Sequence, residues 1–137
     1  MEATDVSPRS KSVLLVEDDQ DVCDAMAELL RDAGYECVQA TNGAEALAIL
    51  EVTRPSLLLV DLIMPTMDGI DLLAVLRESP SLRDIPVIVT TAANERMVGT
   101  QLDVPVLQKP IDLRELSRLL ALYCPLDPTP ANAALGV

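Results

Sequence analysis

The feature that most constrains the fold of this chain is the alternation of short apolar runs with amphipathic segments. Runs such as 57–60 and 87–89 are continuous rather than alternating with polar residues, which is typical of parallel strands covered on both faces. The apolar runs are SVLLVED (12–18), ECVQA (36–40), SLLLVD (56–61), PVIVTT (86–91) and VPVLQK (104–109). The pattern predicts an α/β fold with a parallel sheet.

Helical periodicity in the intervening segments predicts helices over 19–33, 44–51, 70–78 and 113–123. The first helix has one apolar face, formed by Val22, Met26, Leu29, Leu30 and Ala33. We expect the last helix to direct the side chains of Leu113, Leu116 and Leu120 toward the core. Between the last two strands, Asn94 to Gln101 has few apolar positions, so we expect a short or irregular fourth helix there.

Capping residues support these helix boundaries. Asp19 stands where it would cap the first helix, and Gly34 follows that helix where a left-handed residue is favoured. Asn42 with Glu45, and Asp112 with Glu115, have the spacing of a cap and its third helical residue. The starts of three helices are therefore marked by side chains that accept backbone hydrogen bonds.

The chain has 137 residues, which is enough for one domain with a sizeable core. We expect a flexible N-terminal leader over 1–11, the folded domain over 12–123 and a disordered tail over 124–137. The tail is proline-rich and carries a single charged residue, Asp127.

Charge and composition exclude several functions. The net charge is −12, and the only aromatic residues are Tyr35 and Tyr123, so nucleic acid is a poor partner. No histidine is present, which excludes a Ser-His-Asp triad and a His-ligated zinc site. The three cysteines form no CxxC pair, and no apolar stretch has the length of a membrane span. We expect a cytoplasmic protein with no membrane contact.

Polar residues gather where the predicted strands end. Glu17 and Asp18 end the first run, Asp61 ends the third, Thr91 ends the fourth and Lys109 ends the fifth. Ligands of open parallel sheets bind outside the carboxyl ends of the strands, so we expect these side chains to meet there. Clustered carboxylates repel each other unless a cation lies among them, and Mg²⁺ suits such oxygen ligands. One carboxylate would then serve as a nucleophile toward a phosphoryl group.

Four motifs, VLLVEDD, VDLIMPTMDG, PVIVTTA and the late Lys-Pro pair, together resemble the receiver domain of two-component response regulators. The resemblance covers about residues 12–123. It implies a flavodoxin-like fold with five strands in the order 2-1-3-4-5 and five helices. It also implies a signalling module rather than an enzyme that turns over substrate. The module would catalyse its own phosphorylation, with a histidine kinase or a histidine phosphotransfer protein as the phosphoryl donor.

The same resemblance assigns roles to individual residues. Asp61 becomes the phosphoacceptor, and Thr91 and Lys109 become its catalytic partners. Glu17, Asp18 and Asp61, with the backbone carbonyl of Ile63, would hold Mg²⁺. The bond between Lys109 and Pro110 is expected to be cis.

Two departures from the family concern the output of the signal. Val106 stands where receivers usually carry an aromatic residue, so the usual threonine-to-tyrosine switch cannot operate in its ordinary form. Only 17 residues, 92–108, separate Thr91 from Lys109, which shortens the region of the fourth helix. The output partner is left unidentified, and kinase specificity is expected in the first helix, at Gln20, Val22, Cys23, Met26 and Ala27.

The residues alone do not exclude two other functions. One is an interaction domain of the same fold that acts without phosphorylation, which Val106 favours. The other is a small flavodoxin-like cofactor binder, which the fold permits but the scarcity of aromatic residues opposes.

Overall fold

The computed structural model describes residues 11–62, 69–92 and 104–126. Five parallel strands form one sheet in the order β2-β1-β3-β4-β5. The strands are β1 (Ser12–Val16), β2 (Glu36–Ala40), β3 (Leu57–Asp61), β4 (Val87–Thr91) and β5 (Val106–Gln108). The predicted parallel sheet and its strand order are confirmed.

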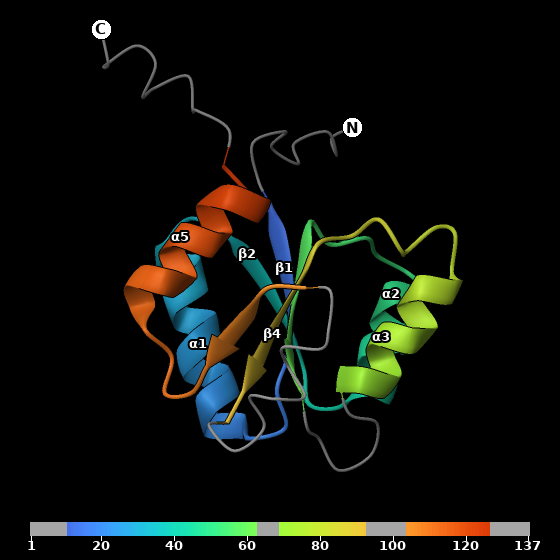
Figure 1. The fold of residues 1–137 in the computed structure, drawn as a ribbon, viewed down its shortest axis with the longest axis horizontal. Coiled ribbons are helices and arrows are strands. Elements are labelled where there is room, and N and C mark those ends of the chain that lie inside the picture. The colour runs from blue at the N-terminus through green and yellow to red at the C-terminus, as the bar shows by residue number, and fades with distance from the viewer. Residues whose placement is uncertain (1–10, 63–68, 93–103, 127–137) are drawn as a thin grey trace, which may run out of the picture.

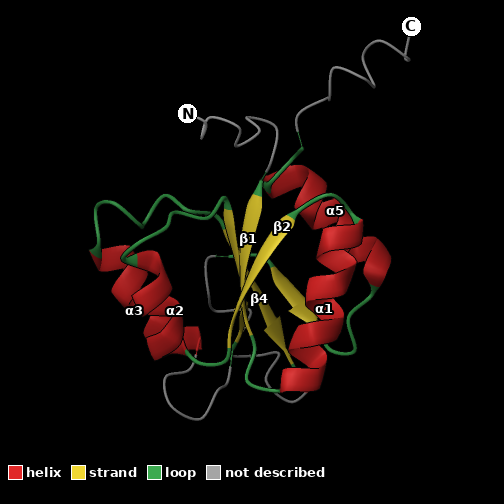
Figure 2. Ribbon diagram, turned by 180° about the vertical axis from the view of Figure 1, so that it is seen from behind, coloured by secondary structure: helices red, strands yellow, loops and turns green. Residues whose placement is uncertain are grey.

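Within the described residues, four helices cover the two faces of this sheet. They are α1 (Gln20–Asp32), α2 (Gly43–Leu50), α3 (Gly69–Glu78) and α5 (Leu113–Tyr123). Figures 1 and 2 show α1 and α5 on one face, with α2 and α3 on the other. The predicted fourth helix over Asn94 to Gln101 lies outside the described residues, as do most of the expected leader and tail.

Successive residues of the central strands alternate between two apolar cores. Leu57 and Leu59 of β3 pack toward α1 and α5. Leu58 and Val60 pack toward α2 and α3. All four side chains are fully buried, which explains why the run contains no polar position before Asp61. The first core also holds three free, buried cysteines, Cys23, Cys37 and Cys124.

The capping predictions are confirmed, with one difference of detail. The carboxylate of Asp19 accepts from the amides of Asp21 and Val22. The side chain of Asn42 accepts from the amide of Glu45 at 2.7 Å. Asp112 accepts from Arg114 at 2.9 Å rather than from the third helical residue.

Gly34 ends the turn after α1 with a φ of +104°. This left-handed conformation favours glycine, as the sequence predicted. A Cβ atom there would also lie 2.9 Å from the Cδ1 atom of Leu126. The next residue, Tyr35, donates its hydroxyl hydrogen to the carbonyl of Cys124 at 2.8 Å, which ties this turn to the end of α5.

The predicted inner faces of two helices were partly wrong. In α1, Met26 and Leu30 are buried, but Val22 and Leu29 are each 38% exposed and Ala33 is exposed. The small residues Cys23 and Ala27 are buried instead. The predicted inner face relied on large apolar side chains, but these lie at the two margins of the buried face. The helix instead lies closest to the sheet where its side chains are small.

The same error affects α5. Leu113, in its first turn, is 51% exposed, while Leu119 is buried beside Leu116 and Leu120.

Burial also limits which residues of α1 can determine kinase specificity. Cys23, Met26 and Ala27 are buried, and buried side chains cannot contact a partner protein. Among the predicted kinase-specificity residues, only Gln20 and Val22 remain exposed.

No described helix combines the length and the hydropathy needed to cross a membrane.

Candidate functional site

The candidate site lies at the carboxyl edge of the sheet, where three strands and the β5–α5 connection bring together residues distant in sequence. Asp61 is the last residue of β3 and pairs in register with Thr90 of β4. Glu17 follows β1, and its amide donates to the carbonyl of Ala40 at the end of β2. Lys109 follows β5, and its amide donates to the carbonyl of Thr91 at 2.7 Å. The backbone ladder therefore positions each functional side chain.

Lys109 forms the centre of the site. Its Nζ atom lies 3.2 Å from Oε1 of Glu17 and 3.2 Å from Oδ2 of Asp61. The two carboxylate side chains are only 6% and 7% exposed, whereas Lys109 is 31% exposed. One partly exposed cation thus bridges two buried anions. The bond from Lys109 to Pro110 is cis, as predicted.

Three carboxylates form a compact cluster. Glu17, Asp18 and Asp61 each offer an oxygen atom, and these atoms lie within 4.8 Å of one another. Asp18 is exposed, while the other two are buried. The structure therefore brings together the three acidic side chains predicted from the strand ends. The carbonyl of Ile63, the fourth predicted ligand, lies outside the described residues.

The electrostatics of the cluster are unbalanced. Burial, followed by the charge of Asp61, raises the pKa of Glu17 from 4.5 to about 7, although the charge of Lys109 opposes this. Burial lowers the pKa of Lys109, but the charges of Asp61 and Glu17 outweigh burial and raise it. The lysine is therefore held as a cation, yet its single charge does not compensate the carboxylates fully. The cluster retains the capacity to bind a further cation.

The two threonines of β4 occupy different faces of the sheet. Thr91 is fully buried, and its hydroxyl donates to the carbonyl of Ala92 at 3.3 Å. Thr90 lines a small apolar cavity with Glu17 and Lys109. The cavity measures about 170 Å³, and its other walls include Met26, Pro110 and Ile111.

The ion pair between Lys109 and Glu17 is the feature of the site that sequence reasoning missed. The two residues are 92 positions apart, and both were assigned to the site for separate reasons. The sequence feature that could have predicted this ion pair is that β1 and β5 end at the same edge of a parallel sheet, where an acidic residue follows β1 and a basic residue follows β5.

Comparison with known proteins gives a consistent result. The sequence pattern described as the response regulator receiver domain matches residues 13–121. The phosphate regulon transcriptional regulatory protein PhoB of Pseudomonas aeruginosa is 33% identical over 132 residues, which cover 93% of this chain. The chain spans 58% of the length of that relative.

Solved structures agree with this match. A putative response regulator from Chloroflexus aurantiacus superimposes with a TM-score of 0.77 at 29% identity, covering 83% of this chain and 97% of the other. The receiver domain of a sensor histidine kinase from Pseudomonas aeruginosa gives 0.76 at 28% identity, with coverages of 83% and 97%. That structure is described with a magnesium ion coordinated in its active site cleft.

Proposed function

The chain belongs to the response regulator receiver domain family, and on this premise we propose that it takes a phosphoryl group onto Asp61 with the help of Mg²⁺. The observation that supports the proposal best is the position of Lys109, 3.2 Å from both Asp61 and Glu17 at the carboxyl edge of the sheet. The protein is a signalling module, and the only reactions we assign to it are its own phosphorylation and dephosphorylation.

In the proposed reaction, a carboxylate oxygen of Asp61 attacks the phosphorus atom of a phosphohistidine. The new P–O bond forms as the P–N bond breaks, and the electron pair of that bond returns to the imidazole nitrogen of the donor. Asp61 must therefore be ionised, and the Lys109 ammonium beside its Oδ2 atom favours that form. The chain contains no histidine, so the phosphohistidine lies outside it.

The residues present fit a magnesium ion. Glu17, Asp18 and Asp61 supply clustered oxygen ligands, and burial together with the charge of Asp61 raises the pKa of Glu17, so a bound cation would favour its ionised form. We assign the same three residues and the carbonyl of Ile63 to the metal. When bound, Mg²⁺ supplies positive charge that offsets the charge of the entering phosphoryl oxygens.

Lys109 and Thr91 are proposed to stabilise the transferred group. The Lys109 ammonium would exchange part of its contact with Asp61 for a phosphoryl oxygen, because the carboxylate of Asp61 loses its negative charge when it is phosphorylated. The Thr91 hydroxyl, at the end of β4, would donate a hydrogen bond to a second phosphoryl oxygen. Thr91→Ser should preserve part of this effect, and Thr91→Ala should remove it.

The phosphoryl donor is proposed to be a histidine kinase or a histidine phosphotransfer protein in the cytoplasm. Among the α1 residues predicted to determine kinase specificity, Gln20 and Val22 are exposed, and they are the candidates for contact with the donor. The output partner is a protein that recognises the phosphorylated form.

Incubation with acetyl phosphate and Mg²⁺, followed by intact mass measurement, tests the proposal. We expect a gain of one phosphoryl group that is lost when Mg²⁺ is chelated and is absent in Asp61→Asn. An unmodified mass under all conditions would instead favour an interaction domain that acts without phosphorylation.

A further inference from the structure

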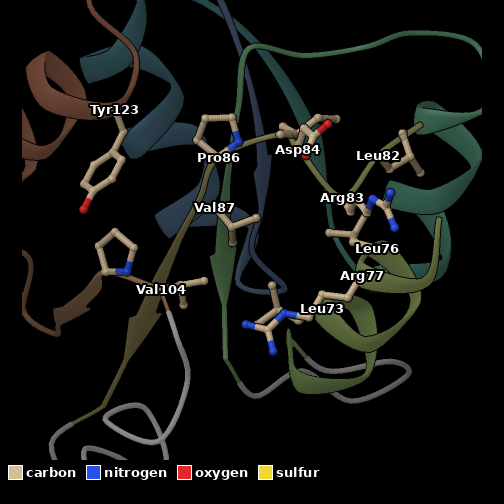
Figure 3. Close-up of a pocket in the computed structure, with 12 residues that line it drawn as sticks. Leu73, Leu76, Arg77, Leu82, Arg83, Asp84, Pro86, Val87, Val104 and Tyr123 are labelled. Atoms are coloured by element: carbon tan, nitrogen blue, oxygen red, sulfur yellow. The ribbon is translucent and has the colours of Figure 1, made fainter. Parts of the chain in front are cut away.

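A second concave surface lies away from the candidate site, between α3 and the end of α5. Its cavity measures about 440 Å³. Leu73 and Leu76 line it from α3, Val87 from β4, Val104 from the chain before β5, and Tyr123 from α5. Figure 3 shows these side chains around a common hollow. We refer to this surface, with Arg77 and Arg83 at its margin, as the α3–α5 groove.

The groove opens at the amino edge of the sheet. Val87 is the first residue of β4, whereas Thr91, at the carboxyl edge, is the last. A strand of this length spans roughly 15 Å. A molecule bound in the groove would therefore leave Asp61 accessible to a phosphoryl donor.

The charge of the groove is opposite to that of the protein. Arg77 and Arg83 line it together with one acidic residue, Asp84, although the chain as a whole carries a net charge of −12. Within the described part of the chain, neither guanidinium group takes part in an ion pair. A third cation, Arg54, donates a hydrogen bond to the carbonyl of Ser81 in the neighbouring α3–β4 connection. Positive charge is thus concentrated beside an apolar hollow.

We propose that the α3–α5 groove binds a segment of a partner protein that carries apolar side chains next to carboxylates. The apolar side chains would cover Leu73, Val87 and Tyr123, and the carboxylates would pair with Arg77 and Arg83. A second copy of this chain fits less well, because two molecules that each carry a charge of −12 repel one another. The proposal is independent of phosphorylation at Asp61.

The test begins with a phage-displayed library of random linear peptides selected on the wild-type protein. A selected peptide is then synthesised with a fluorescent label, and its affinity is measured by anisotropy. We expect selected sequences to combine Leu, Ile, Met or Phe with Asp or Glu. The double variant Arg77→Glu/Arg83→Glu should bind the peptide about tenfold more weakly, because it reverses the two charges at the margin of the groove.

The matched control is Arg114→Glu/Arg118→Glu, which adds the same negative charge on α5 outside the groove. It should bind the peptide as the wild type does. For the apolar wall, Tyr123→Ala should weaken binding, while Leu122→Ala, at a 62% exposed neighbour outside the groove, should not. Thermal unfolding of each variant separates loss of binding from loss of folding, and Asp61→Asn should bind the peptide normally.

Several results would overturn the proposal. They are the selection of no peptide, a basic or uncharged consensus, or equal weakening in the two double-arginine variants. Stronger peptide binding after truncation at Leu126 would identify the C-terminal tail as the occupant. A dimer of the wild-type protein that dissociates in Arg77→Glu/Arg83→Glu would identify a second copy as the occupant.

Discussion

Replacing Glu17 by Gln tests the electrostatic imbalance of the candidate site. In the absence of metal, burial and the neighbouring charge of Asp61 raise the pKa of Glu17 from 4.5 to about 7. The folded protein therefore holds a proton on Glu17 more tightly than the unfolded chain does. Stability from this group is fully present below pH 4.5 and is lost as the pH rises through 7. Glu17→Gln keeps the shape of the side chain and removes the titration.

The magnitude follows from the two pKa values. With 4.5 in the unfolded chain and about 7 in the folded one, linkage gives a loss of about 2 to 3 kcal/mol in the free energy of unfolding between pH 5 and pH 8. Lys109 remains charged throughout this range, because its pKa is raised above the ordinary 10.5. The variant should not show this component of the pH dependence.

Urea unfolding of both proteins at pH 5 and pH 8, in the presence of a chelator, measures the effect. The difference in unfolding free energy between Glu17→Gln and the wild type should grow by about 2 to 3 kcal/mol in favour of the variant at pH 8. Titration of carboxylates remote from the cluster is common to both proteins and cancels in this difference. A difference that does not change with pH would refute the assigned electrostatics.

Further predictions concern the same cluster and the two cores. Lys109→Met should raise the pKa of Glu17 further, because the lysine charge opposes the effect of burial, and the stability of this variant should fall more steeply with pH than that of the wild type. Mg²⁺ should stabilise the wild type more at pH 8 than at pH 5 in thermal unfolding, since protons compete for the carboxylates, and equal shifts would contradict metal binding at this cluster. Leu59→Ala should cost about 3 kcal/mol in urea unfolding, because its fully buried side chain would leave a cavity. Tyr35→Phe should cost about 1 kcal/mol through loss of the buried hydrogen bond to Cys124, whereas Tyr123→Phe, at a 40% exposed side chain, should have no measurable effect.

The strands were predictable because the central apolar runs are short and continuous, whereas their order was an implication of the resemblance to receiver domains. A run such as 57–60 has no polar position, and that pattern requires cover on both faces. The helix starts were predictable for a similar local reason, since Asp19 and Asn42 cap in the structure as their positions indicated.

The inner face of α1 was less predictable because side-chain size misled the assignment. Val22 and Leu29 are large and apolar but lie at the margins, and the fully buried Cys23 and Ala27 carry little hydrophobic signal. Which stripe faces the sheet depends on how closely the helix approaches it, and that is a property of the assembled core.

The acidic cluster was predictable from strand ends, but its internal contacts were not. Glu17, Asp18 and Asp61 follow or end strands that are neighbours in the sheet. The bridging position of Lys109 depends on the path of the chain after β5, which periodicity does not describe. The α3–α5 groove likewise combines residues from α3, β4 and α5, and no segment of the sequence marks it.

Identification of the phosphorylated residue tests the central claim most directly. After reaction with acetyl phosphate and Mg²⁺, borohydride reduction converts an aspartyl phosphate to homoserine, and peptide mass spectrometry locates it. We predict homoserine at position 61 alone, and none when Mg²⁺ is chelated. Homoserine at position 18 or at any other aspartate, or no conversion at all, would contradict the account.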